Sequence, residues 1–415
     1  MTWLSNERIL VGGFLKHFKD TSAAIGTSEP NPFSRKIMVD RPLRGLGANT
    51  VLVGKGTELD RWQLERNLKS ARAARTLLIV LALDSVAHTS ALDFQNNERD
   101  KLVVFGKSQL ESLVASPYPH DTFLQFVRDQ VSFLSLVPFE TSAPACGPQF
   151  TGRSAELRKL QSNQDFAVFG PGGIGKSSLL RQWMWLRRLQ DSEAYERTIE
   201  VDLQDISEPN DAAHRIITSI ERKFSVRTGT AEGVIVKTFA DAVEALHQEH
   251  SRRLNTDQPF CLILDEVGGL IEVDRHREFA DYFQNVNATG RDHTRFPMLH
   301  VIRNLTSRGV LRITLCARES TRSLLESEHN PFCVPGGISR LKPLEIRPLE
   351  ESDARKMLTL PLACLGLDLA ALSTRINDAL SKSTGIPVRI ADCGLDIALE
   401  AEPHMRRRTS VLDTT

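Results

Sequence analysis

The chain of 415 residues lacks an excess of charge of either sign, because 52 Lys and Arg side chains balance 52 Asp and Glu side chains. Zero net charge argues against a globally basic nucleic-acid binder and leaves room only for a local basic patch. Hydrophobic residues make up 41% and charged residues 25% of the sequence, which is typical of an ordinary globular protein. A chain of this length usually holds two or three domains.

Paired cysteines and long apolar runs are also absent. The six cysteines form no CxxC pair and have no neighbours at the spacing of zinc ligands, and Cys261 and Cys316 lie in apolar runs. This pattern is typical of buried, reduced thiols in a cytoplasmic protein. No stretch approaches the roughly 20 apolar residues that cross a bilayer, so no membrane partner is expected. The opening segment has Glu7 in place of a basic leader and is interpreted as folded.

Composition and periodicity divide the chain into five parts. Residues 1–140 contain strand-like and helix-like runs, and residues 141–149 are rich in small residues and proline, which predicts a linker. Residues 150–348 alternate short apolar runs with longer amphipathic runs, which predicts a parallel α/β sheet. Residues 349–402 are expected to be helical, and residues 403–415 to be a flexible tail.

Short apolar runs predict the strands of the middle part. The run at 260–264 is apolar at every position, as expected for a central strand that is covered on both faces. The predicted strands are residues 165–169, 198–202, 260–264, 311–316 and 344–347. The predicted helices between them are residues 176–189, 212–224, 239–253 and 297–308.

A glycine-rich segment follows the first of these strands. Residues 170–177, GPGGIGKS, match the P-loop pattern G-x-x-x-x-G-K-[ST] between a strand and a helix, a position that disfavours an incidental turn. Glycines let backbone N–H groups surround phosphate oxygens, and the helix directs its positive end at the same anion. Lys176 can reach the β- and γ-phosphates, and Ser177 can ligate Mg²⁺. The predicted phosphate-binding residues are Gly170, Pro171, Gly172, Gly173, Ile174, Gly175, Lys176, Ser177 and Ser178.

Two carboxylates end the strand at 260–264. Asp265 and Glu266 are expected at the carboxyl edge of the sheet, where open α/β sheets bind ligands. Asp265 would hold Mg²⁺, and Glu266 would orient and deprotonate the attacking water. Read alone, the pair is equally well a solvated strand end, and the P-loop favours the functional interpretation. No guanine-reading N/T-K-x-D motif is present, so the expected cofactors are ATP and Mg²⁺.

Segments around these motifs resemble those of STAND ATPases and their AAA+ relatives, including origin-recognition-type proteins. Residues 150–157, FTGRSAEL, resemble the F-x-G-R-x-x-E-L signature, which implies that Gly152 and Arg153 lie against the base and sugar of the nucleotide. The strand that ends at Arg318 resembles one that closes with an arginine sensing the γ-phosphate, which implies a catalytic role. Residues 385–388, GIPV, resemble a G-x-P motif, which implies that Pro387 packs near the adenine.

Each flanking segment also has a simpler interpretation, as a helix cap, a surface arginine or a helix-starting proline. Taken together, the resemblance implies an α/β P-loop NTPase fold of the ASCE type. It further implies a C-terminal helical lid subdomain at 349–402. A small N-terminal α/β domain is predicted separately at 1–140. An arginine finger stays open among Arg308, Arg322 and Arg340.

The N-terminal part resembles the later half of Mrr-type restriction-endonuclease folds in its order of strand, loop, strand and residues 108–114, SQLESLV. A nuclease of that class needs a D…[EQ]-x-K constellation to hold Mg²⁺. The nearest candidate, at Val53 to Lys55, lacks the acid or glutamine. A recognition or interaction domain with a degenerate site is therefore favoured over an active nuclease.

Three functions remain as hypotheses. The first is an ATP-hydrolysing switch of STAND/AAA+ type. ATP binding between the α/β domain and the helical lid would change their relative orientation and drive assembly of a homo-oligomer, in bacterial signalling or defence by family analogy. The second is a nucleotide-dependent scaffold that recruits DNA or a partner protein through the N-terminal domain. The third is a DNA-cleaving effector. STAND proteins usually continue into a winged helix and a sensor region, so a sensor is expected to be missing, to lie in the N-terminal part or to be supplied by a partner protein.

Overall fold

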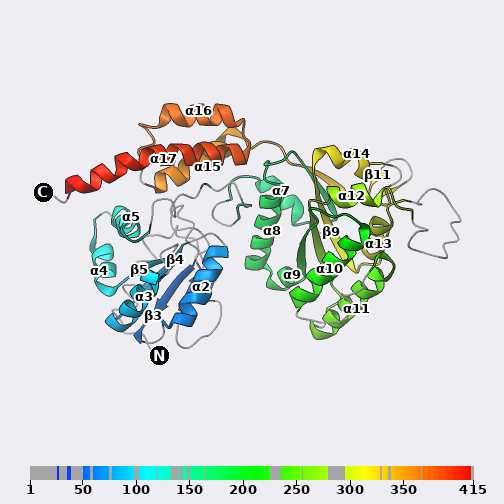
Figure 1. The fold of residues 1–415 in the computed structure, drawn as a ribbon, viewed down its shortest axis with the longest axis horizontal. Coiled ribbons are helices and arrows are strands. Elements are labelled where there is room, and N and C mark those ends of the chain that lie inside the picture. The colour runs from blue at the N-terminus through cyan, green and yellow to red at the C-terminus, as the bar shows by residue number, and fades with distance from the viewer. Residues whose placement is uncertain are drawn as a thin grey trace. The chain divides into compact units, whose positions relative to one another are not determined.

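The computed structural model in Figure 1 divides the chain into two compact units. Unit 1 comprises Met1–Ala143, Gly147–Gly152 and Leu349–Thr415, and unit 2 comprises Pro144–Cys146 and Arg153–Pro348. The residues that the structure describes are 26–27, 35–38, 50–56, 59–73, 77–97, 102–117, 119–131, 139, 144–146, 150–162, 164–224, 235–254, 256–278, 295–327, 330–334, 338–365 and 367–412.

Unit 2 is built on a parallel sheet. Its strands are β6 (Phe166–Phe169), β7 (Thr198–Asp202), β8 (Phe260–Asp265), β9 (Leu311–Ala317) and β12 (Lys342–Glu345). They lie side by side in the order β12-β6-β9-β8-β7, and every neighbouring pair is parallel. This is the strand order of the ASCE type of P-loop NTPase fold, so the predicted α/β fold class is confirmed. All carboxyl ends of the strands therefore meet at one edge.

Helices connect these strands and cover the sheet (Figure 1). They are α7 (Ser154–Leu160), α8 (Lys176–Gln190), α9 (Ser192–Glu196), α10 (Pro209–Phe224), α11 (Val236–Leu254), α12 (Gly268–Asp274), α13 (Pro297–Ser307), the short 3-10 helix η4 (Glu319–Thr321) and α14 (Arg322–Leu325). A short antiparallel pair, β10 (Cys333–Val334) and β11 (Ile338–Ser339), follows α14.

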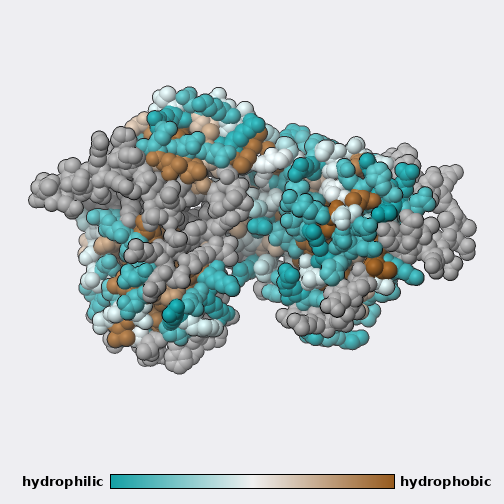
Figure 2. All heavy atoms as spheres, in the orientation of Figure 1, coloured by the Kyte–Doolittle hydropathy of each residue, from teal (hydrophilic) through white to brown (hydrophobic). Residues whose placement is uncertain are grey.

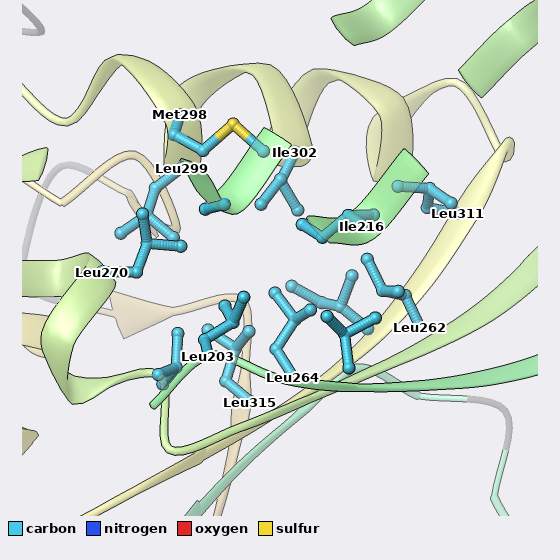
Figure 3. Packing of buried hydrophobic residues seen from close by; sticks show 14 of the residues in the cluster. Leu203, Ile216, Leu262, Leu264, Leu270, Met298, Leu299, Ile302, Leu311 and Leu315 are labelled. Carbon is cyan, nitrogen blue, oxygen red and sulfur yellow. The ribbon is translucent and has the colours of Figure 1, made fainter. Parts of the chain in front are cut away.

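The core of unit 2 fills the space between the sheet and its helices. Figure 3 shows Leu262 and Leu264 of β8 directed toward Ile302 of α13 and Ile216 of α10, and all four side chains are fully buried. Every residue of β8 is buried, which agrees with the expectation of a strand covered on both faces. Burial of each such side chain contributes about 1.5–3 kcal/mol, so this packing fixes where the strand ends lie.

One carboxylate is buried in this core. The Asp274 side chain at the end of α12 accepts backbone N–H groups from Met298 at 3.0 Å and Leu299 at 2.9 Å. These N–H groups belong to the first turn of α13, whose donors have no partner inside the helix. Burial raises the pKa of Asp274 to about 7, although both N–H groups act in the opposite direction.

Unit 1 contains a mixed sheet in the order β1-β2-β3-β4-β5. The strands are β1 (Gly26–Thr27), β2 (Arg35–Met38), β3 (Thr50–Gly54), β4 (Leu78–Ala82) and β5 (Leu102–Phe105). The pairs β3-β4 and β4-β5 are parallel, while β1-β2 and β2-β3 are antiparallel. The helices of this part are α2 (Arg61–Ala73), α3 (Ser85–Asn97), α4 (Lys107–Ala115) and α5 (Pro119–Gln130). The predicted small N-terminal α/β fold is confirmed.

Three helices complete unit 1, namely α15 (Glu351–Cys364), α16 (Ser373–Ser383) and α17 (Pro387–Leu412). The expected helical character after residue 349 is confirmed, and α17 continues beyond the predicted end at residue 402. Leu360 of α15 and Leu399 of α17 are exposed. Figure 2 shows hydrophobic surface in the region of these helices. Among the described residues, no helix is both long enough and apolar enough to cross a membrane.

One hydrophobic cluster of unit 1 extends from the sheet to these C-terminal helices. It includes Ile79 of β4, Phe139, and Leu358 of α15. Phe139 lies directly against α17, since a Cβ atom added at Gly394 would be 2.5 Å from the Phe139 ring. The sequence placed residues 349–402 in a subdomain of their own, and this shared packing is a feature it did not predict.

Asp274 makes stability depend on pH. Between about pH 4 and pH 7 the folded chain holds a proton on Asp274 that the unfolded chain has lost, so the stability contribution falls as pH rises through this window. The full effect is about 4 kcal/mol. In urea unfolding at about pH 5 and about pH 8, Asp274→Asn should lose less stability on going to the higher pH than wild type. The exposed acid of the same helix, Glu272→Gln, should behave like wild type, and equal losses in Asp274→Asn and wild type would contradict this account.

Candidate functional site

The glycine-rich segment forms the turn between β6 and α8. Gly173 has φ 71° and Gly175 has φ 94°, both in the left-handed region where glycine meets no steric penalty. Gly175 is the residue that precedes the first turn of α8. The N–H groups of that turn have no acceptor inside the helix, so the turn presents donors and the positive end of the helix dipole to an anion.

The lysine of the motif is held at the beginning of this loop. Lys176 is only 6% exposed. Its Nζ donates to the carbonyl oxygens of Gly170 at 2.9 Å and Pro171 at 3.0 Å. An ammonium group carries three N–H donors, so these two bonds leave one donor for a phosphate oxygen.

The acidic pair lies at the same edge of the sheet as this loop. Asp265 ends β8 and is 8% exposed, and its Oδ1 accepts the Glu266 N–H at 3.0 Å. Glu266 has φ 50°, an uncommon value for a residue with a side chain and one that occurs often at functional turns. Parallel register places Phe169 beside Ala317 and Leu264 beside Leu315, which aligns the ends of β6, β9 and β8.

Burial and a neighbouring carboxylate also affect the thiol between these groups. The pKa of Cys316 is raised well above its ordinary value, first by burial and then by Asp265, with which its side chain forms a hydrogen bond. The expectation of a buried thiol at Cys316 is confirmed.

Arg318 follows β9 and contacts the acidic pair. Its Nε lies 3.6 Å from Glu266 Oε2, and its side chain is 66% exposed. An exposed pair of this kind is worth about 1 kcal/mol or less, so the guanidinium can exchange this partner for a phosphate. The structure thus brings Arg318 and Glu266 together, and their roles as sensor and base stay predictions.

The two serines of the motif have different surroundings. Ser177 is the second residue of α8 and is half-buried. Ser178 Oγ accepts the backbone N–H of Ala145 at 3.1 Å, so it is occupied by the segment at 144–146. The nucleotide-binding role of Ser178 stays a prediction, and its contact with Ala145 could not be inferred from the motif.

Arg153 supports the P-loop. Its backbone is left-handed with φ 59°, and its side chain is 4% exposed. Nη2 donates to the Ile174 carbonyl at 2.7 Å, and Nη1 lies 3.8 Å from Glu156. The resemblance implied a position against the base and sugar, whereas the contact that the structure places here is with the backbone of the loop.

Gly152 and Pro387 belong to unit 1, whereas the P-loop belongs to unit 2. Gly152 has φ 76°, and a Cβ atom there would lie 2.6 Å from Asp353 Oδ2 at the start of α15. Pro387 is the first residue of α17, a position that suits proline. Their roles beside the sugar and adenine stay predictions.

A third carboxylate at this edge was not predicted as functional. Asp202 ends β7 directly opposite Asp265 in the parallel register. The available signal was the acidic residue that closes the predicted strand at 198–202.

Within the part of the chain that the structure describes, no three His, Cys, Asp or Glu side chains are grouped closely enough to hold a metal ion. A Mg²⁺ ion at Ser177 and Asp265 would therefore also need phosphate oxygens and water.

The candidates for an arginine finger all have partners. Arg308 pairs with Glu244, and Arg322 pairs with Glu319 and Glu326. Arg340 precedes β12 and donates to Ser307 at 3.4 Å. These contacts do not distinguish the candidates.

In the N-terminal part, Val53 and Lys55 lie at the end of β3, and the loss of the Mrr-type site stays a prediction.

No family model matches the sequence, and no curated protein matches it. Solved structures with a similar fold include a Walker-type ATPase of Pyrococcus abyssi, 16% identical over 67% of this chain and 79% of its own length, with a TM-score of 0.43. The ORC1 protein of Aeropyrum pernix in complex with DNA is 16% identical over 61% of each chain, with a TM-score of 0.41. The ORC2 protein of the same organism, in ADPNP–ADP complexes, is 15% identical over 65% of this chain and 66% of its own, with a TM-score of 0.45.

The matched region spans less than two thirds of either Aeropyrum pernix protein. All three TM-scores lie below 0.5, so the function proposed below rests on the residues of this chain.

Replacement of Arg153 tests its support of the P-loop. Arg153→Met keeps most of the buried volume but leaves the Ile174 carbonyl without this donor, which should lower the free energy of unfolding by about 1–3 kcal/mol. Urea unfolding would measure this loss. The exposed arginine of the same helix provides the control, because Arg158→Met should change stability by less than about 0.5 kcal/mol. Equal losses in the two variants would show that the contact with Ile174 is unimportant.

Proposed function

We propose that the protein binds ATP with Mg²⁺ at residues 170–177 and hydrolyses it. The observation that carries this proposal is the shared sheet edge, where the Lys176 ammonium, Asp265 and Glu266 follow the carboxyl ends of two parallel strands. A cationic loop that binds phosphates beside a metal-binding acid and a base is the arrangement that phosphoryl transfer to water needs.

Each residue would have a separate role. Lys176 and the N–H groups of the loop would neutralise the β- and γ-phosphates. Ser177 and Asp265 would hold Mg²⁺ together with phosphate oxygens and water, and the ion would neutralise charge on the leaving group. Glu266 would orient the attacking water and accept its proton.

Arg318 would couple nucleotide binding to the availability of the base. It contacts Glu266 at 3.6 Å, and a γ-phosphate would compete for the same guanidinium. Movement of Arg318 toward the phosphate would leave the Glu266 carboxylate able to accept a proton from water. In the ADP state the pair with Glu266 would be restored. This exchange gives the side chain different partners in the two states, which a nucleotide switch requires.

The finer hypotheses come from the sequence motifs. They are a STAND/AAA+ type switch in the cytoplasm, assembly of a homo-oligomer with ATP, and recruitment of DNA or a protein through the N-terminal part of unit 1. A role in bacterial defence is proposed from family analogy alone.

Steady-state ATP hydrolysis tests the proposal. Wild type should turn over ATP, and Lys176→Ala and Glu266→Gln should each lower kcat by about 100-fold or more, since each removes charge stabilisation or the base. Glu272→Gln removes a carboxylate from the neighbouring helix and should leave the rate unchanged. Size-exclusion chromatography of Glu266→Gln with ATP should show a larger species if ATP drives assembly.

The other hypotheses predict different results. Tight nucleotide binding by wild type without turnover, and without a change in size, would contradict the ATPase proposal and favour the scaffold. Mg²⁺-dependent nicking of DNA that survives Lys176→Ala and disappears with EDTA would favour the nuclease effector.

A further inference from the structure

A polar cavity lies in unit 2 at the amino ends of the strands, the edge opposite the P-loop. It has a volume of about 430 Å³ and is lined by residues at or before the starts of β6, β8, β9 and β12. The lengths of β6 and β9 separate the two edges by roughly 13–23 Å. The cavity is therefore distinct from the candidate nucleotide site.

The lining of this cavity is strongly cationic. Arg312, Arg340 and Lys342 contribute three positive charges, and Asp165 contributes the one carboxylate. One oxygen of Asp165 already accepts the Ile313 N–H at 2.9 Å. The lining therefore has a net charge of +2, which would balance the charge of about −2 on a phosphate monoester.

Two arginines each have one buried guanidinium nitrogen without a hydrogen-bond partner among the described residues. These atoms are Nη1 of Arg312, which lines the cavity, and Nε of Arg303, which is not part of the lining. Burial lowers the pKa of Arg303, and the positive charge of Arg340 lowers it further. Buried donors without acceptors are costly, and like charges held together add to that cost. An anion in the cavity would supply acceptors to the cationic side chains that line it and reduce the repulsion among them.

We propose that this cavity is an anion site that binds a phosphate group, on a small phosphorylated ligand or on a nucleic-acid backbone. Guanidinium groups match the geometry of phosphate oxygens, and Arg312 is pre-positioned because its position in β9 is fixed by the sheet. The volume exceeds that of a single ion and lies within the range of small-molecule sites. Pro259 and Leu311 add apolar wall to the polar lining, as such sites usually have.

The test uses the full chain with Lys176→Ala as background, so that the P-loop lysine does not contribute. Inorganic pyrophosphate is the probe, and isothermal titration calorimetry measures its Kd. Arg340→Gln and Arg312→Met, each added to the background, should raise the Kd by about tenfold or more, because each removes a charged donor to phosphate. Arg340 is exposed, so its replacement should leave folding intact.

Arg308→Gln is the matched control. It removes an exposed arginine near the same edge that pairs with Glu244 and does not line the cavity, so the Kd should stay within about twofold. Absence of pyrophosphate binding in the Lys176→Ala background would overturn the proposal, as would equal weakening by Arg308→Gln and Arg340→Gln.

Competition by a short single-stranded DNA distinguishes the two sources of the phosphate. Displacement of pyrophosphate by DNA would assign the site to a nucleic-acid backbone, and binding without competition would assign it to a small phosphorylated ligand. Both results support the site. Because the P-loop lysine is absent throughout, the outcome does not depend on the proposed ATPase activity.

Discussion

The parallel register of β6, β9 and β8 is the constraint on which the candidate site depends. It places Phe169 beside Ala317 and Leu264 beside Leu315, so the P-loop, Arg318 and the acidic pair leave the sheet at the same edge. The three strands are almost wholly buried, so a slip of one residue would exchange the side chains that pack against the helices on the two faces of the sheet. Hydrophobic packing thus sets the positions of charged groups that it does not itself contact.

Polar contacts hold the side chains and backbone groups of the loops that follow these strands. Arg153 braces the Ile174 carbonyl, and Asp274 holds the first N–H groups of α13 against the core. Lys176 is held by the carbonyl oxygens of its own loop, and Glu266 by its ion pair with Arg318. The contacts of Arg153 and Asp274 are buried and should be stiff. The ion pair of Arg318 with Glu266 is exposed and can change partner, so this pair is the part of the site that would respond to phosphate.

Local patterns explain what could be predicted from the sequence. The strands of unit 2 and the loop at 170–177 have short-range signals, in apolar runs and in glycines that permit positive φ. Other features depend on distant residues and have no such signal. Four such features arise only when the chain is folded. They are the contact of Arg153 with Ile174, that of Ser178 with Ala145, the packing of Phe139 against Gly394 and the cationic cavity at Arg312. Asp202 lay within reach of prediction, since the same rule that selected Asp265 applies to it.

Amide hydrogen exchange of the wild-type chain tests most directly whether the carboxyl edge of unit 2 is the nucleotide site. The comparison is between the chain alone and the chain with Mg²⁺ and a slowly hydrolysed ATP analogue, with binding verified independently. Exchange should slow in peptides that cover residues 170–178 and 265–267 and stay unchanged in α10 at Pro209–Phe224. Bound analogue with unchanged exchange at 170–178 would contradict the account.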